Sequence, residues 1–108
     1  MEPLSRITSA TVDVLDVLLA GQEPRWGLEI VKATGRASGT VYPILDRLER
    51  SGWVTSTWEA DSERRGPRRR LYQITGEAAP AARRLLAARA EREAARARAG
   101  DPLPQPGT

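Results

Sequence analysis

The chain of 108 residues contains no cysteine, no histidine and no phenylalanine, and only 5% of its residues are aromatic. Without cysteine and histidine there is no disulfide framework, no zinc finger, no thiol nucleophile and no imidazole base. These absences exclude most hydrolase mechanisms, and the scattered carboxylates show no pairing that suits acid–base catalysis. We therefore expect a protein that is not an enzyme and that uses no metal and no cofactor.

A long hydrophobic run is also absent. The first apolar stretch, residues 7–20, contains Asp13 and Asp16, and is therefore a poor signal-peptide core or membrane span. We expect a cytoplasmic protein that does not bind membranes. At this length, one small domain with an appendage is expected, and its core must be built from Leu, Val, Ile and three Trp residues.

Positive charge is concentrated in the second half of the chain. Residues 1–58 hold six basic and seven acidic side chains, whereas residues 59–108 hold eleven and seven. Sixteen of the seventeen basic residues are arginine. Because a GC-rich genome also favours arginine codons, the position of these charges is more informative than their number.

A first helix is predicted from the apolar spacing over residues 7–20. Ser5, Thr8 or Ser9 supplies its cap, and Gly21 ends it. The apolar face is too broad for a peripheral helix, so we expect this helix to pack on two sides, one of which is a second subunit.

Two further helices follow, joined by a tight turn. The second is predicted over residues 26–33, and Gly35 stands where a left-handed residue commonly ends a helix. The third is predicted to open at Ser38 or Thr40 and to close at Gly52.

The apolar period changes from helical to alternating after the third helix. Residues 53–58 and 69–75 are predicted to be two strands, and the polar stretch between them contains Gly66 and Pro67. Together they predict a β-hairpin with a long, charged tip.

A last helix is predicted from Thr75, which is able to cap it, to about residue 99. Leu85 and Leu86 are its only large apolar residues, and most of the rest is Ala and Arg. Pro80 either delays the start of this helix or bends its first turn. Such a helix is marginally stable alone and is better explained as one side of a dimer.

Three helices followed by a basic two-stranded hairpin are the plan of a winged helix-turn-helix, a mainly helical fold. One segment is more specific: residues 38–54, SGTVYPILDRLERSGWV. It closely resembles the recognition-helix segment of the PadR family of bacterial transcriptional regulators. Residues 66–75, GPRRRLYQIT, resemble the second wing strand of that family, and residues 26–30, WGLEI, are similar to the opening of its second helix. The resemblance covers about residues 5–90.

The resemblance implies a homodimeric, sequence-specific, DNA-binding regulator with a repressing role. It matches the short subgroup of the family, in which a single C-terminal helix helps to form the dimer. The implied organisation is a winged helix-turn-helix DNA-binding domain, a C-terminal dimerisation helix and a disordered tail, over residues 1–75, 76–99 and 100–108.

The expected DNA-binding surface of the third helix is its N-terminal end. Asp46 and Glu49 on its exposed face repel phosphates, whereas the helix dipole and free amides at the N-terminus attract them. The residues expected there are Ser38, Gly39, Thr40 and Tyr42. From spacing alone, ordinary capping by the two hydroxyls and an ordinary turn at the glycine are the better interpretation, and only the family resemblance favours DNA contact.

The expected second DNA-binding surface is the hairpin, where a cluster of one charge sign is unusual for a solvated loop. We expect contact with phosphates or the minor groove from Arg65, Arg68 and Arg69, and leave Arg64 and Arg70 open. Cross-strand pairs with the acidic residues just upstream, such as Glu59, are the alternative use of this charge.

The dimer interface is expected to use Leu15, Leu18, Leu85 and Leu86. Two-fold symmetry then predicts a palindromic operator whose half-sites lie about 34 Å apart. The competing interpretation is a winged-helix module that binds proteins and not specific DNA. A small-molecule effector is not identified, since three tryptophans in a protein without phenylalanine are better explained as core and interface residues.

Overall fold

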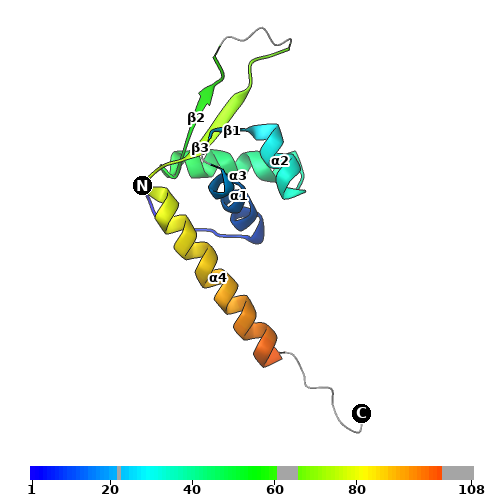
Figure 1. Cartoon of the computed structure of the whole chain (residues 1–108), viewed down its shortest axis with the longest axis vertical. Helices are drawn as coiled ribbons and strands as arrows, with labels where there is room; N and C mark the ends of the chain where they lie inside the picture. The colour runs from blue at the N-terminus through cyan, green and yellow to red at the C-terminus, as the bar shows by residue number, and fades with distance from the viewer. Residues whose placement is uncertain (22, 61–65, 101–108) are drawn as a thin grey trace.

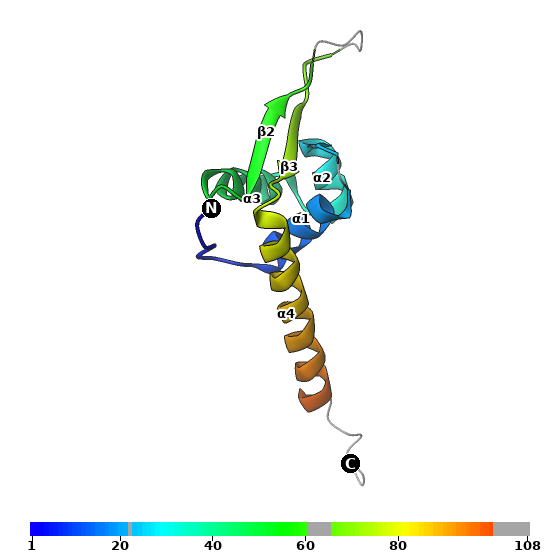
Figure 2. The same ribbon diagram turned by 60° about the vertical axis from the view of Figure 1, so that its left-hand side comes forward.

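The computed structural model describes residues 1–21, 23–60 and 66–100. Its elements are α1 (Ser9–Ala20), β1 (Arg25–Trp26), α2 (Gly27–Thr34), α3 (Ser38–Arg50), β2 (Val54–Trp58), β3 (Arg70–Ile74) and α4 (Ala78–Gly100). Helices α1 to α3 form a body from which the hairpin of β2 and β3, here called the wing, rises at one end, while α4 projects from the other (Figure 1, Figure 2). The predicted mainly helical, winged helix-turn-helix fold is confirmed.

The core lies between the three helices of the body and is aliphatic. On α1, α2 and α3, apolar residues recur every three or four positions, so that each helix turns one face inward. The apolar side chains of these three helices that keep 3% or less of their surface exposed are Val14, Leu15, Leu18, Ile30, Val41, Ile44, Leu45 and Leu48. Burying each of these contributes about 1.5–3 kcal/mol to folding, which makes the body the stable platform for the wing.

The sheet is antiparallel and has the strand order β1-β3-β2. Its register places Val54 opposite Ile74 and Ser56 opposite Tyr72 on the face toward α3. The two wing strands agree with the prediction to within one residue. The short β1 was not predicted, because Trp26 was assigned to the start of the second helix and two residues are too few to show an alternating pattern.

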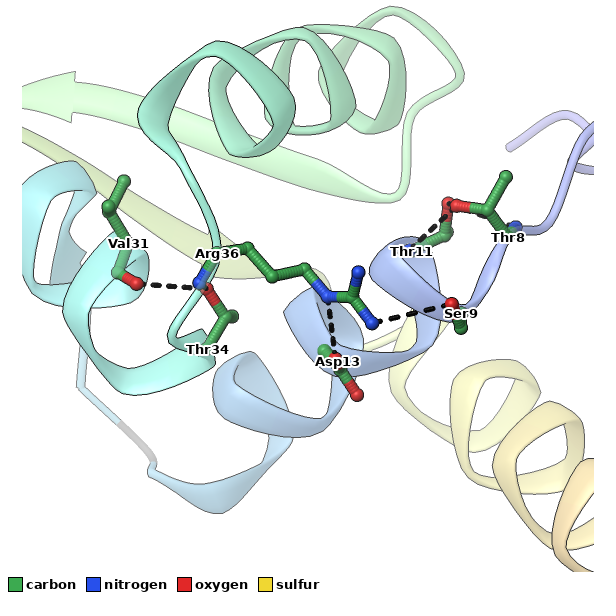
Figure 3. A network of polar contacts seen from close by, with 7 residues as sticks. All are labelled: Thr8, Ser9, Thr11, Asp13, Val31, Thr34 and Arg36. Atoms are coloured by element: carbon green, nitrogen blue, oxygen red, sulfur yellow. Dashed lines mark hydrogen bonds and ion pairs between the residues drawn. The ribbon is translucent and has the colours of Figure 1, made fainter.

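The helix ends agree with the sequence at several positions. Thr8 caps α1: its Oγ1 accepts a hydrogen bond from the amide of Thr11 at 3.2 Å, and its own amide donates to Thr11 Oγ1 at 3.3 Å (Figure 3). Gly35 ends α2 in the left-handed region, with φ of 70°. The predicted capping of α3 by Ser38 or Thr40 is wrong, because Ala37 occupies the N-cap and no side chain caps the helix.

Helix α4 begins as the sequence predicts and then leaves the body. Thr75 Oγ1 accepts a hydrogen bond from the amide of Ala78 at 3.0 Å. Pro80 lies in the first turn, where a helical amide has no partner in any case, so the helix starts without delay. Ala78 and Ala82 are fully buried, whereas residues 91–100 are all exposed. Gly100, predicted to begin the tail, is the last residue of α4, and the rest of the predicted tail lies outside the described residues.

The described residues show neither a membrane-spanning helix nor a cluster of metal-binding side chains. No helix in this part of the chain combines the length and the apolar character that a membrane crossing requires. Within the same ranges, no three acidic, histidine or cysteine side chains gather closely enough to bind a metal ion.

Candidate nucleic-acid interface

The first turn of α3 is an open helix terminus. Ser38, Gly39 and Thr40 are all exposed. The amides of Thr40 and Val41 donate to the carbonyl oxygen of Ala37 at 3.0 and 3.1 Å, so the turn closes through its backbone alone. Because no side chain caps the helix, the hydroxyls of Ser38 and Thr40 are not consumed by capping. The terminus therefore presents hydroxyl groups, a bare glycine backbone and the positive end of the helix dipole on one surface.

Tyr42 lies one turn further along α3, on the same face as Ser38. Its side chain is 40% exposed, and its ring packs where Gly27 lacks a side chain. A Cβ at Gly27 would stand 2.8 Å from Tyr42 Cε1 and 3.2 Å from Cε1 of Tyr72. The glycine at the start of α2 therefore makes room for the half-exposed ring of Tyr42 beside the helix terminus.

The turn before α3 is tied to α1 by an arginine that sequence reasoning missed. Arg36 Nε donates to Asp13 Oδ2 at 2.8 Å, and Arg36 Nη2 donates to Ser9 Oγ at 3.3 Å (Figure 3). The amide of Arg36 donates to Thr34 Oγ1 at 3.2 Å, and that hydroxyl donates to the carbonyl oxygen of Val31. These bonds hold the start of α3 in place relative to α1.

On the wing, Arg68 and Arg69 are held against the hairpin itself. Arg68 is exposed, and its Nε donates to the carbonyl oxygen of Glu59 at 3.1 Å. The amide of Arg69 donates to Glu59 Oε1 at 3.2 Å, and its guanidinium lies 3.9 Å from the centroid of the Trp26 ring. Its Nε is buried without a hydrogen-bond partner among the described residues. The predicted contact residue Arg65 lies outside the described residues, as does Arg64, which the sequence left open.

Arg70 lies on the opposite face of the wing from Arg69, because side chains alternate along a strand. Its Nη2 is 3.7 Å from Glu49 Oε2, and its guanidinium is 5.2 Å from the centroid of the Trp58 ring. Burial raises the pKa of the Tyr72 phenol, and the adjacent Arg70 opposes this shift. The face of the sheet toward α3 therefore carries Arg70, which the sequence left open, and not Arg69.

The expected dimer residues fall into two groups. Leu15 and Leu18 need correction: they are 0% and 3% exposed within a single chain, so they have no surface to offer a second subunit. Leu85 and Leu86 are half-buried and pack against the core from α4. An open groove of about 290 Å³ separates α4 from α1, and it is lined by Val12, Asp13, Asp16, Leu86, Arg89, Ala90 and Glu93.

Comparisons with known proteins agree on the fold. No curated protein matches the chain by sequence. Among solved structures, a PadR-like transcription factor from Bacteroides fragilis is 24% identical with a TM-score of 0.63, covering 81% of this chain and 85% of that one. The circadian-clock-associated protein Pex from Anabaena is 26% identical with a TM-score of 0.63, covering 81% and 79%.

A third structure, the complex of Staphylococcus aureus MepR with DNA, is 23% identical with a TM-score of 0.63, covering 88% of this chain and 74% of that one. The model of the PadR-like family of transcriptional regulators matches residues 14–81. That segment runs from α1 through the helix-turn-helix and the wing to the first turn of α4. The chain therefore belongs to the PadR-like family of transcriptional regulators.

Proposed function

We propose that this protein is a homodimeric repressor that binds double-stranded DNA sequence-specifically, with the N-terminal end of α3 in the major groove and the wing along the flanking backbone. The observation that carries this proposal is the exposed, uncapped first turn of α3. An uncapped helix N-terminus attracts phosphate oxygens through its amides and its dipole, and it positions the helix for base contacts. Capping, the alternative use of Ser38 and Thr40, does not occur.

Base reading is assigned to Thr40 and Tyr42, and backbone contact to Ser38 and Gly39. Tyr42 is suited to reading because Gly27 leaves room for its ring beside the helix terminus while the residue stays 40% exposed. Arg68, and with it Arg65 and Arg69, is assigned to phosphates or the minor groove. The likeness in fold to MepR, which was solved in complex with DNA, supports this placement.

The homodimer is proposed because α4 is poorly covered by its own chain. Its second half, residues 91–100, is exposed, and a helix of Ala and Arg is only marginally stable without tertiary contacts. The groove between α1 and α4 offers Val12 and Leu86 at its wall, and a second copy related by a two-fold axis would cover both. Two recognition helices related in this way match a palindromic operator with half-sites about 34 Å apart.

Titration of the protein's own upstream DNA in a gel-shift assay, against random DNA of equal length, tests the proposal. We expect tighter binding of the upstream fragment, and protection mapping is expected to show two protected segments about one helical turn apart. A protein-interaction module would bind both DNAs equally weakly. Sedimentation at micromolar concentration tests the dimer, and a monomer there would contradict it.

Exchange of the proposed base-reading residues tests their assignment. Thr40→Ala and Tyr42→Phe should reduce the ratio of operator affinity to random-DNA affinity, because base contacts carry the discrimination. A fall in both affinities by the same factor would assign these side chains to the phosphate backbone instead.

A further inference from the structure

One carboxylate joins α3 to both strands of the wing. Glu49 Oε2 accepts a hydrogen bond from Ser56 Oγ on β2 at 2.6 Å, and it lies 3.7 Å from Nη2 of Arg70 on β3. The side chains of Glu49 and Arg70 are only 34% and 38% exposed. These three side chains, here called the Glu49 link, connect the recognition helix with the base of the wing.

The charge of Arg70 is already engaged in this arrangement. Trp58 is its cross-strand partner, and the guanidinium lies 5.2 Å from the centre of the indole ring. Glu49 compensates its charge from the side of α3. Arg70 is therefore placed to hold two elements together, whereas a phosphate anchor needs a guanidinium that is available to the solvent.

We propose that Glu49 and Arg70 are positioning residues that hold the wing at a fixed angle to α3, so that Glu49 strengthens DNA binding in spite of its negative charge. This inference rests on the proposed function. A helix in the major groove and a wing on the flanking backbone must engage one duplex at the same time. The apparent affinity then falls in proportion to the fraction of molecules in which the wing stands at the matching angle.

The sign of the effect separates positioning from simple electrostatics. An acidic residue on the recognition helix repels phosphates, so its removal by itself should tighten binding. Loss of the Glu49 link should weaken binding about fivefold, the factor that corresponds to one hydrogen bond of ordinary net strength. Because no phosphate contact is lost, the slope of log affinity against log salt should stay unchanged.

Asp46 provides a matched control on the same helix. It also carries one negative charge and also pairs with an arginine, Arg50, but it lies 55% exposed and makes no hydrogen bond or ion pair with the described residues of the wing. Asp46→Ala therefore removes the same charge as Glu49→Ala without touching the link. We expect Asp46→Ala to bind the upstream DNA as tightly as the unmodified protein or more tightly.

The test measures upstream-DNA affinity of the full chain by gel shift over a range of salt concentrations. Glu49→Ala and Ser56→Ala should each bind about fivefold more weakly, and Glu49→Gln, which keeps an oxygen acceptor for Ser56, should recover part of the loss. Arg70→Ala combined with Glu49→Ala should bind no more weakly than the worse of the two single variants, because both act through one link.

Tighter DNA binding by Glu49→Ala would overturn the inference, and so would equal changes in DNA affinity for Glu49→Ala and Asp46→Ala. A third contrary result is a salt slope that Arg70→Ala reduces by about 0.9, as expected for a lost phosphate contact. Circular dichroism verifies that each variant is folded before its DNA affinity is compared with that of the unmodified protein. Should Glu49→Ala fail to fold, Ser56→Ala, which changes no charge, decides the outcome. Failure of the unmodified protein to prefer upstream DNA would instead refute the proposed function, and the inference with it.

Discussion

Replacing Gly39 with alanine should raise the stability of the protein and weaken its binding to DNA. Gly39 is exposed in the first turn of α3, and a Cβ built on it has no heavy atom within 4 Å. Among the described residues, the glycines with positive φ are Gly35, Gly52 and Gly66, so the backbone at Gly39 suits an L-amino acid without strain. The folded protein therefore accepts the methyl group at no steric cost.

The gain in stability comes from the unfolded chain, which loses conformational freedom when glycine is replaced. At a compatible position this change is worth about 0.4–1 kcal/mol. Because 1 kcal/mol corresponds to roughly 4–8 °C in a domain of this size, we expect Tm to rise by about 2–8 °C in a thermal unfolding experiment followed by circular dichroism.

The loss in DNA binding follows from the proposed placement of this turn against the duplex. A glycine allows the backbone to approach a phosphate closely, and a methyl group in that contact pushes the helix away. We expect operator affinity to fall about tenfold, which corresponds to roughly 1.4 kcal/mol. Gel-shift titration at fixed salt concentration measures it.

Gly76→Ala is the control for this experiment. Gly76 lies in the turn before α4, has no positive φ, and also leaves a Cβ without a heavy atom within 4 Å. The control should leave DNA affinity unchanged. A Gly39→Ala protein that is more stable and binds operator as tightly as the unmodified chain would show that the first turn of α3 does not lie against DNA.

Three further substitutions test other parts of the structure. Gly27→Ala should move the Tyr42 ring and cost at most about 1 kcal/mol, because the atom that the new Cβ meets at 2.8 Å, Tyr42 Cε1, is near the end of a 40% exposed residue; unchanged Tm together with unchanged operator affinity would contradict the packing described above. Asp13→Asn should lower the free energy of unfolding in urea by less than about 1 kcal/mol, since the ion pair of Asp13 with Arg36 joins side chains that are 43% and 36% exposed. A loss of stability that does not shrink in high salt would argue against an ion pair. Arg68→Ala should weaken binding to operator and random DNA alike and lower the salt slope by about 0.9, and an unchanged slope would remove Arg68 from the phosphate contacts.

Most of the fold follows from local patterns in the sequence. The helical spacing of apolar residues and the glycines at positions 35 and 52 place α2 and α3 to within about two residues, since both signals act within a single turn. The strand β1 could not be predicted, because Arg25 and Trp26 form a strand only through pairing with residues 71 and 72, which lie far away in the sequence. The N-cap of α3 was predicted wrongly for a different reason. Ser38 is a good capping residue, but the turn at Arg36, whose amide donates to Thr34 Oγ1, places Ala37 at the N-cap.

The candidate site was only partly predictable, because it depends on contacts between distant residues. The start of α3 was predicted from the helix boundary, but its use as a DNA-binding surface was expected only from the family resemblance. The bridge from Arg36 to Asp13 spans 23 positions, and the space that Gly27 leaves for Tyr42 joins two helices. Neither contact has a period or a local motif, so no pattern in the sequence indicates it.

The faces of Arg69 and Arg70 could have been predicted from the sequence. The alternation of side chains along the strand indicates them, but the interpretation considered only the positive charge of the two residues. The alternation of the strand places Tyr72 and Ile74 on one face, and Tyr72 is buried at 7% exposure. Arg70 stands two positions before Tyr72 and must share that face, whereas Arg69 must take the other. A count of arginines does not separate the two: the Arg69 guanidinium lies over the Trp26 ring, whereas the charge of Arg70 is engaged by Glu49 and is withdrawn from phosphate contact. The salt dependence of DNA binding should therefore indicate fewer phosphate contacts than the number of wing arginines suggests.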